Sequence, residues 1–420
     1  MNLRRFTLFA ATALMGLMSV QAHAGGFQIG EQGTKAMGMG NAFTAIADDP
    51  SAQWYNPAGS SFQSGTQIMT GADIIIVPNL DFSTNALNPA HPARTSMKSK
   101  VLGVPHFYVS HSFENSPITL GVGVNSPFGL ETDWPGNSPF ATSNTFSQIK
   151  LVNVNPNISW KINEHLAIAA GFDYVRLLKV RLNNSAQLLE GSGADGWGGN
   201  VALLYRNDMI RFGVSYRSRV SLDINNGTVI GGPALAALGA PGAVGATGIA
   251  STKVVLPDQV DVGFAYMPNE DWMLSLDIDW VNWSTFDNLD FHYAPSALAT
   301  ALTGGTNFRT LPENWSSTIA IRAGVEWKYS PDISLRGGYT YDPTPVDDRF
   351  FNPGIPDRDR HLFTVGLGYD VNQSLTLDMA YMFVYFVDRN QVASTGTNAV
   401  RNGNYSGNVH IVSGSLVYRF

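Results

Sequence analysis

The sequence predicts an all-β protein: a transmembrane antiparallel β-barrel of fourteen strands, with an N-terminal segment folded into the lumen as a hatch. Three observations predict it. An export signal opens the chain, segments of roughly ten residues alternate apolar and polar side chains, and tight turns alternate with long polar loops. Only 14% of the 420 residues are charged, yet no stretch after the signal suits a membrane-spanning helix.

The N-terminus predicts export from the cytoplasm. Arg4 and Arg5 precede the apolar run 6–20, which ends in the small-x-small sequence Ala22-His23-Ala24. We therefore expect residues 1–24 to be a cleaved signal peptide. The full chain has a formal net charge of -7, which argues against a nucleic-acid partner. The chain has no cysteine, so it has neither a disulfide scaffold nor a thiolate metal site.

Alternation with period two predicts strands with one apolar and one polar face. In 272–280 every second residue is large and apolar, from Trp272 to Trp280, and the intervening positions include Asp277 and Asp279. Segments 211–224 and 320–329 repeat the pattern. A secreted sandwich or propeller also alternates, but it seldom sets so many charged residues and glycines opposite apolar rows that end in aromatics.

The turns predict the number of strands. Six tight turns stand between alternating segments, and a barrel with both ends in the periplasm and six such turns has fourteen strands. The turns lie at 115–117, 163–164, 207–208, 269–271, 331–332 and 372–373. Seven outer loops are expected near 79–100, 125–147, 182–196, 226–252, 285–314, 343–360 and 388–407. The last strand ends at Phe420, which we expect the barrel assembly machinery to bind.

Residues 25–65 do not fit a strand. They are rich in glycine and contain short apolar helical fragments such as 42–47. Because a barrel of fourteen strands has a wide lumen, we expect this segment to fill it as the hatch. The predicted organisation is therefore a signal peptide at 1–24, a hatch at 25–65 and a barrel at 66–420.

Several motifs, in order along the whole mature chain, resemble the FadL/TodX transporters of long-chain fatty acids and hydrocarbons in the bacterial outer membrane. The motifs are Gly25-Gly26-Phe27-Gln28, Gly38-Met39-Gly40-Asn41-Ala42, Ala45-Ile46-Ala47-Asp48-Asp49, Asn56-Pro57-Ala58, Tyr216-Arg217-Ser218, Leu256-Pro257-Asp258, 280–286 and 355–360. The resemblance implies capture of a hydrophobic molecule at outer loops, binding in an apolar luminal pocket, and lateral exit at a kink in the third strand. Exit through the wall means that an apolar molecule is not exposed to water on its way into the membrane.

The kink is expected at 122–129. Pro127 has no N–H for the ladder and Gly129 is typical of a bulge, so we expect these two residues to interrupt strand pairing and open the wall. Asn125 and Phe128 are expected to belong to the same lateral gate. Alternatively, Pro127 only ends the strand at the outer loop. The Asn56-Pro57-Ala58 corner is rigid. If it has a functional role, we expect the side-chain amide of Asn56 to form a hydrogen bond with the barrel wall near the kink.

A fatty acid needs a cation for its carboxylate in an apolar pocket. Strand parity places Lys179, Arg181, Arg217 and Arg336 inward. The resemblance adds Arg360 and implies that Phe27 reaches the ligand pocket. The family also has a lysine just before the position of Trp315, and this chain lacks it, because Glu313 and Asn314 occupy these positions. The alternative is that the inward cations pair with luminal carboxylates and bind no substrate.

Exposed loop residues are expected to capture substrate unless they collapse into a cap: Trp134, Pro139, Phe140, Leu235, Leu238 and Val244. No nucleophile with a base and no metal-ligand spacing is evident, so we expect no enzyme, cofactor or metal. The expected partners are a hydrophobic small molecule, outer-membrane lipid and lipopolysaccharide, and the expected state is a monomer. Long-chain fatty acid is the first substrate hypothesis and aromatic or alkane hydrocarbon the second. A general porin or a surface receptor is less favoured, because the hatch speaks against a porin.

Overall fold

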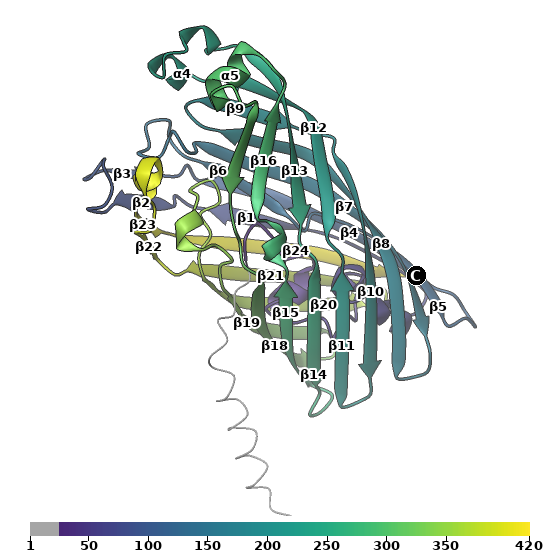
Figure 1. The fold of residues 1–420 in the computed structure, drawn as a ribbon. Coiled ribbons are helices and arrows are strands. Elements are labelled where there is room, and N and C mark those ends of the chain that lie inside the picture. Colours follow the sequence, from purple (N-terminus) through teal and green to yellow (C-terminus); the bar gives the residue numbers. More distant parts are fainter. Residues whose placement is uncertain (1–24) are drawn as a thin grey trace, which may run out of the picture.

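A computed structural model describes residues 25–420. The predicted signal peptide lies outside them. Within this part of the chain, 14 strands close an antiparallel barrel (Figure 1). In order around the wall they are β1 (Thr66–Val77), β4 (Lys100–Ser112), β5 (Ile118–Asn125), β7 (Phe146–Lys161), β8 (Leu166–Asn183), β10 (Asp195–Arg206), β11 (Ile210–Arg217), β14 (Gln259–Tyr266), β15 (Trp272–Val281), β18 (Thr318–Ser330), β19 (Ile333–Asp342), β20 (Arg360–Asn372), β21 (Leu375–Phe386) and β24 (Asn408–Arg419).

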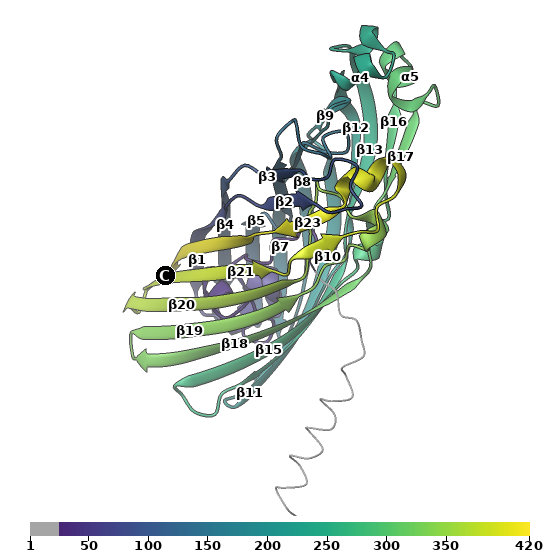
Figure 2. The ribbon, with the colours of Figure 1, turned by 90° about the vertical axis from the view of Figure 1, so that its left-hand side faces the viewer.

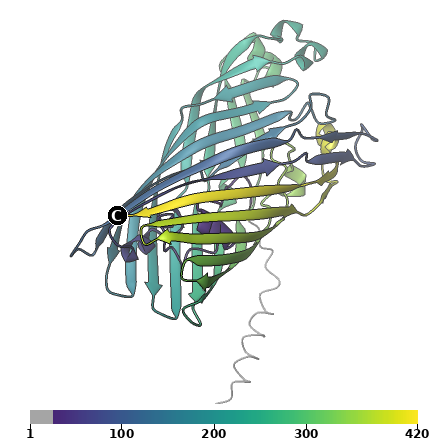
Figure 3. The same ribbon diagram turned by 180° about the vertical axis from the view of Figure 1, so that it is seen from behind.

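The last strand closes the barrel on the first. β1 pairs with β24 along one edge and with β4 along the other, and Figure 3 shows the yellow C-terminal strand beside the dark blue first strands. All six predicted tight turns join neighbouring strands at one end of the barrel. The predicted fold, fourteen strands with an N-terminal hatch, is confirmed.

The wall continues beyond the barrel on one side (Figure 1). The added strands are β6 (Gly129–Asp133), β9 (Gln187–Gly191), β12 (Val220–Gly231), β13 (Thr247–Leu256), β16 (Asn288–Tyr293) and β17 (Phe308–Pro312). The loop expected at 226–252 was too long, because β-branched Thr228, Val229 and Ile230 extend β12 to pair with β9. Its remaining tip holds α4 (Ala234–Ala237) and η2 (Pro241–Ala243), beside α5 (Ala297–Thr303) of the next loop. The short helix η3 (Trp283–Thr285) begins that loop and packs against Phe27.

A second, four-stranded sheet covers the other side of the outer end (Figure 2). It joins the first and last outer loops, and its strands are β22 (Arg389–Gln391), β23 (Gly403–Ser406), β2 (Asp81–Thr84) and β3 (Arg94–Ser96). The short helices η4 (Asp348–Phe350) and η5 (Gly396–Arg401) belong to the same end. No helix in residues 25–420 is both long and apolar enough to cross a membrane.

Residues 25–65 fold inside the barrel, toward the end with the tight turns (Figures 1 and 3). They form α2 (Thr34–Gly38), α3 (Ala52–Tyr55) and η1 (Pro57–Phe62), and most of their side chains are buried. Apolar residues of this segment, including Phe43, Ile46 and Trp54, pack with Met69 of β1 and Tyr108 of β4. The hatch is thus packed against the inner face of the wall.

Candidate functional site

The barrel wall is interrupted between β5 and β6. Both strands pair with β7, Asn125 opposite Asn153 and Gly129 opposite Lys150. Only β5 also pairs with β4, up to Val124 opposite Phe107. Among the described residues, β4 therefore has no ladder partner on this edge over 101–106. Pro127 lies in the interruption and has no N–H with which to continue the ladder. The sequence placed this break correctly.

The hatch satisfies the backbone groups that the interruption frees. The Ile29 N–H donates to the carbonyl of Pro127 at 2.8 Å, and the Gly129 N–H donates to the carbonyl of Phe27 at 3.0 Å. Gln28 and Phe128 form an isolated antiparallel bridge between these two bonds. Residues 27–29 thus act as a short luminal strand for the kink. Motif reasoning named both segments but did not predict that they pair.

A cavity of about 580 Å³ passes through the wall at the interruption. Residues 101–105 of β4 and 129–132 of β6 line it from the two sides. Its lining includes inward side chains such as Leu151, and also Val101 and Leu178, which face outward and are 70% and 53% exposed. Because one cavity contacts both faces of the sheet, it connects the lumen with the outer surface of the barrel.

Phe27 lines this cavity, and its contact with a ligand stays a prediction. Its ring centroid is 4.9 Å from that of Trp283, 5.4 Å from Phe286, 5.9 Å from Trp315 and 6.0 Å from Phe128. Edge-on contacts of this kind stabilise aromatic clusters beyond the burial of area alone. Phe27 therefore holds the hatch N-terminus against the kink and presents an apolar surface to the cavity.

Two arginines line the cavity from its outer-loop side. Arg360 pairs with Asp342 at 2.5 Å. Arg358 is buried and donates to the carbonyls of Tyr405 at 3.0 Å and Gly407 at 3.1 Å. The sequence analysis named Arg360 and missed Arg358, although both lie in the motif 355–360. Lys150 is the third basic residue of the lining, which also includes the carboxyls of Glu31, Glu131 and Asp357 among mainly apolar side chains.

Lys179 and Arg181 do not line the cavity, and the prediction that they point inward was wrong. The register between β7 and β8 shifts, with Leu151 opposite Leu177 and Lys150 opposite Lys179. This bulge adds Leu178 to β8 and reverses the parity of the residues after it. Both cations therefore face outward, where Glu190 lies 3.8 Å from Lys179 Nζ and 3.0 Å from Arg181 Nε.

Arg217 and Arg336 point inward as predicted, but they bind the hatch and the wall and do not line the cavity. Arg217 pairs with Asp173, donates to the carbonyl of Trp54 at 3.1 Å and lies over the Trp54 ring. Arg336 pairs with Glu326 at 2.6 Å and also with Asp378. These contacts match the alternative in which luminal cations are structural.

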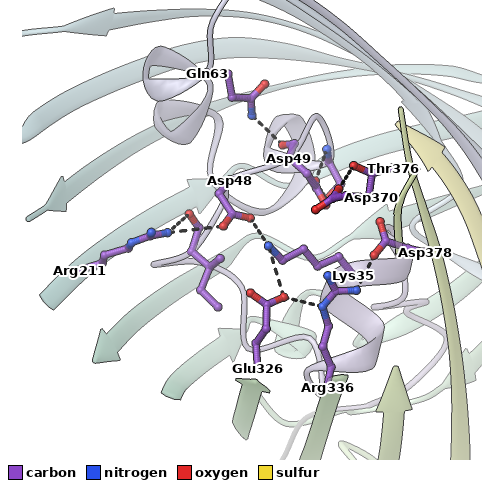
Figure 4. Close-up of polar contacts among 12 residues, drawn as sticks. Lys35, Asp48, Asp49, Gln63, Arg211, Glu326, Arg336, Asp370, Thr376 and Asp378 are labelled. Carbon is purple, nitrogen blue, oxygen red and sulfur yellow. Dashed lines mark hydrogen bonds and ion pairs between the residues drawn. The ribbon is translucent and has the colours of Figure 1, made fainter. Parts of the chain in front are cut away.

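Arg336 belongs to an ionic network that fastens the hatch to the wall (Figure 4). Lys35 of α2 lies 2.9 Å from Asp48 and 3.6 Å from Glu326 of β18. Asp48 is also 3.7 Å from Arg211 of β11. Charges on β11 and β18 thus hold the hatch, and removing one partner of such a buried pair leaves the other charge buried and unpaired, which is costly.

The Asn56-Pro57-Ala58 corner is buried, and its amide bonds the wall at a different strand from the one expected. Asn56 Nδ2 donates to the carbonyls of Thr44 at 2.9 Å and Leu203 at 3.0 Å, while its Oδ1 accepts from the Ala58 N–H at 3.1 Å. Leu203 lies on β10, not beside the kink. The proposed direct link between Asn56 and the kink is therefore wrong.

Gln53 contacts the kinked region instead, and the sequence analysis missed it. Its Oε1 accepts from Asn157 of β7 at 3.1 Å, and its Nε2 donates to Ser60 at 2.7 Å. A Cβ on Gly121 of β5 would clash with this amide. The glycine is thus required by the close approach of the hatch. Gly121 and Gly123 on the kinked strand were the only sequence signal for this contact.

The outer loops near the cavity form a closed cap. Trp134 and Phe140 are buried, with ring centroids 5.1 Å apart, and Phe140 lies 5.0 Å from Phe82. The expected capture role for these two residues is therefore wrong for this conformation, because distant loops cover them. At the tip between β12 and β13, Leu235 is buried whereas Leu238 and Val244 are exposed.

Glu313 is a buried carboxyl in the segment between β17 and β18. Burial raises its pKa from 4.5 to about 7, against the opposing field of Arg401. The folded state therefore holds this proton more tightly than the unfolded state. The resulting stability is present below about pH 4.5 and is lost as the pH rises to about 7.

Glu313→Gln is expected to remove the free-energy cost of ionising this buried carboxyl in the folded state. At pH 8 the variant should gain at most about 3 kcal/mol, and at pH 4 it should match the wild-type protein. The measurement is the temperature at which the barrel loses its compact gel migration at each pH. Glu114→Gln, at an exposed position, is the control. An equal gain at both pH values would contradict the assignment.

Comparisons with known proteins agree with this geometry. Residues 15–420 match the family model described as outer membrane protein transport protein (OMPP1/FadL/TodX). The chain is 24% identical to a putative outer membrane protein of Neisseria meningitidis serogroup B, over 100% of this chain and 99% of that one. It is also 24% identical to the long-chain fatty acid transport protein of Escherichia coli K12, over 90% and 92%.

Solved structures share the fold. A FadL homologue from Pseudomonas aeruginosa superimposes with a TM-score of 0.77 at 18% identity, covering 94% of this chain and 100% of that one. The Pseudomonas putida toluene transporter TodX gives 0.68 at 18% identity, covering 95% and 99%. The chain belongs to the OMPP1/FadL/TodX family, and it is an outer-membrane β-barrel that transports hydrophobic molecules and is not an enzyme.

Proposed function

We propose that this protein takes up long-chain fatty acids and releases them sideways into the outer membrane between β4 and β6. The observation that carries the proposal is the cavity that contacts both faces of the wall at the interruption. Its lining is mainly apolar, including Leu102 and Val104 of β4 and Leu130 of β6. An alkyl chain crossing there keeps apolar contacts, each Å² of which is worth about 25 cal/mol relative to water.

The hatch supports lateral rather than axial release. Its residues are buried against the wall, and the Lys35, Asp48, Glu326 and Arg336 network fixes it on several strands (Figure 4). An axial path would require breaking these buried ion pairs, each at a cost of several kcal/mol. The wall cavity needs no such rearrangement.

A carboxylate is favoured as the substrate head group by Arg360 and Arg358, which both line the cavity. A fatty acid carboxylate placed there gains charge-assisted hydrogen bonds from one or both guanidinium groups. The second candidate is a neutral hydrocarbon, which the pairing of Arg360 with Asp342 favours. We assign first capture at the loop tip to the exposed Leu238 and Val244.

We further propose that the protein works as a monomer, since one chain closes the barrel. Its apolar outer face is in contact with lipid and its outer rim with lipopolysaccharide. Phe420, which is exposed at the end of β24, is the proposed contact of the barrel assembly machinery. These partners follow from a lipid-facing barrel of this kind.

The substitution Arg360→Ala distinguishes uptake of long-chain fatty acids from uptake of neutral hydrocarbons. We expect oleate uptake, in cells that lack their own transporter, to fall several-fold while toluene uptake remains, because only oleate carries a carboxylate. Arg360→Lys should restore part of the oleate uptake. Arg349→Ala, an exposed arginine of the same loop, is the control. Toluene uptake by the wild-type protein without oleate uptake would support the hydrocarbon function instead.

A further inference from the structure

Two lysines lie directly opposite each other on the outer face of the wall. Lys150 of β7 and Lys179 of β8 are Cα partners, and their side chains are 54% and 45% exposed. Like charges in directly opposite positions of two strands repel each other. A pairing of this kind costs stability unless an anion lies between or beside the two ammonium groups.

The carboxylates near this pair are bound more closely by other groups. Glu131 is 3.7 Å from Lys150, but it is 3.1 Å from Lys100 and accepts from Gln148 at 2.6 Å. Likewise, Glu190 is 3.8 Å from Lys179 but 3.0 Å from Arg181. With Asp133, which lies 3.0 Å from Lys98 and 3.1 Å from Lys100, three carboxylates are shared among five cations, and the lysine pair keeps an excess positive charge.

The bulge in β8 creates this arrangement. In a regular strand, Leu178 would point outward and Lys179, two residues after the inward Leu177, would point into the lumen. The bulge turns it outward to face Lys150, and bulges are often found where a side chain near a functional site is re-aimed. Leu178 and Lys150 both line the wall cavity at its outer mouth. The pair therefore stands where the cavity opens.

The outer face changes from apolar to charged at the same level. On β4, Val101 and Phe107 are apolar and exposed, whereas Lys100 is followed toward the outer loop by Lys98. The exposed pair of Arg176 and Asp195 continues this charged rim. Charged outward side chains mark the end of the hydrocarbon layer around a barrel, so the cavity opens at the boundary between acyl chains and head groups.

We propose that Lys150 and Lys179 form an exit site for the carboxylate of a long-chain amphiphile leaving through the wall. The tail enters the outer leaflet through the opening, and the head group stays at the level of the two ammonium groups. This inference rests on the proposed lateral release of fatty acids. It adds a second anion site outside the barrel, separate from Arg358 and Arg360 at the luminal side.

The test compares oleate with the uncharged oleyl alcohol. Lys150→Gln/Lys179→Gln should lower oleate uptake about fivefold, a loss typical of removing exposed charge interactions, and leave oleyl alcohol uptake unchanged. Lys150→Arg/Lys179→Arg should restore oleate uptake. Lys253→Gln is the matched control, since Lys253 is 55% exposed and lies 4.0 Å from Asp223, away from the cavity.

The outcomes separate this site from the proposed function. If the wild-type protein carries neither compound, lateral release of fatty acids fails and the exit site fails with it. If it carries oleate and the double glutamine variant carries oleate equally well, only the exit site is overturned. If the variant loses both compounds together with co-purified lipid phosphate, the lysines bind a resident lipid and the carboxylate site is also overturned.

A second measurement locates the head group without relying on the transport rate. The N-hydroxysuccinimide ester of oleate acylates a lysine amine that lies next to its carbonyl carbon, releasing N-hydroxysuccinimide. We expect peptide mass spectrometry to find acylation of Lys150 or Lys179 in excess of Lys98 and Lys253, which are 63% and 55% exposed and thus at least as accessible. Labelling in proportion to exposure would contradict the exit site.

Discussion

Replacing Gly103 with tryptophan is expected to reduce uptake to the level of cells without the transporter. Gly103 lies on β4 at the opening, faces outward and lines the cavity. A Cβ there has Ile74 Cδ1 as its nearest neighbour, at 4.0 Å. The position therefore accepts a side chain without disturbing the fold, and an indole ring would occupy the outer mouth of the cavity.

Gly414→Trp is the matched control. Gly414 also faces outward, on β24, and a Cβ there has its nearest neighbour at 4.0 Å, but it does not line the cavity. Both variants should keep the compact gel migration of the folded barrel. Normal uptake by folded Gly103→Trp would contradict passage between β4 and β6, and loss of uptake in Gly414→Trp would show that bulk on the lipid face is harmful anywhere.

Asn56→Ala is expected to loosen the hatch and make the barrel permeable to hydrophilic solutes. The substitution removes three hydrogen bonds and takes the Asn56 donor away from the buried carbonyl of Thr44 and the partly buried carbonyl of Leu203. We expect a cost of about 2 kcal/mol or more to hatch docking. The measurement is single-channel conductance in planar bilayers, together with the sensitivity of cells to vancomycin.

Asn88→Ala provides the comparison for this variant. Asn88 is also buried and donates to two backbone carbonyls, of Val400 and Asn402, both at 2.8 Å, but it lies in the outer cap. It should therefore leave the hatch in place and the conductance low. Unchanged conductance in Asn56→Ala would show that the ionic network around Lys35 holds the hatch without this amide.

Local rules predicted the strands well. Tight turns and period-two alternation depend on neighbouring residues, so they gave the strand number and the break at Pro127 correctly. Parity also placed Arg217 and Arg336 inward. It failed for Lys179 and Arg181 because one extra residue, Leu178, reverses the alternation. Nothing in the composition of that segment marks a bulge, which arises from pairing with β7.

Contacts between distant segments could not be predicted in this way. Asn56 was expected to bond the wall, and it does, but its partner strand depends on how the whole hatch sits in the lumen. Phe140 was expected at an exposed surface, yet Phe82 and Tyr405, from the first and last outer loops, cover it. The pairing of residues 27–29 with the kink likewise joins segments that are far apart in sequence.

Reversible blocking of the wall opening tests the lateral route most directly. Since the chain has no cysteine, Gly103→Cys offers one thiol for a bulky methanethiosulfonate reagent. If release is lateral, labelling stops oleate uptake, reduction of the new disulfide restores it, and labelled Gly414→Cys is unaffected. Full oleate uptake by completely labelled Gly103→Cys protein would contradict lateral release between β4 and β6.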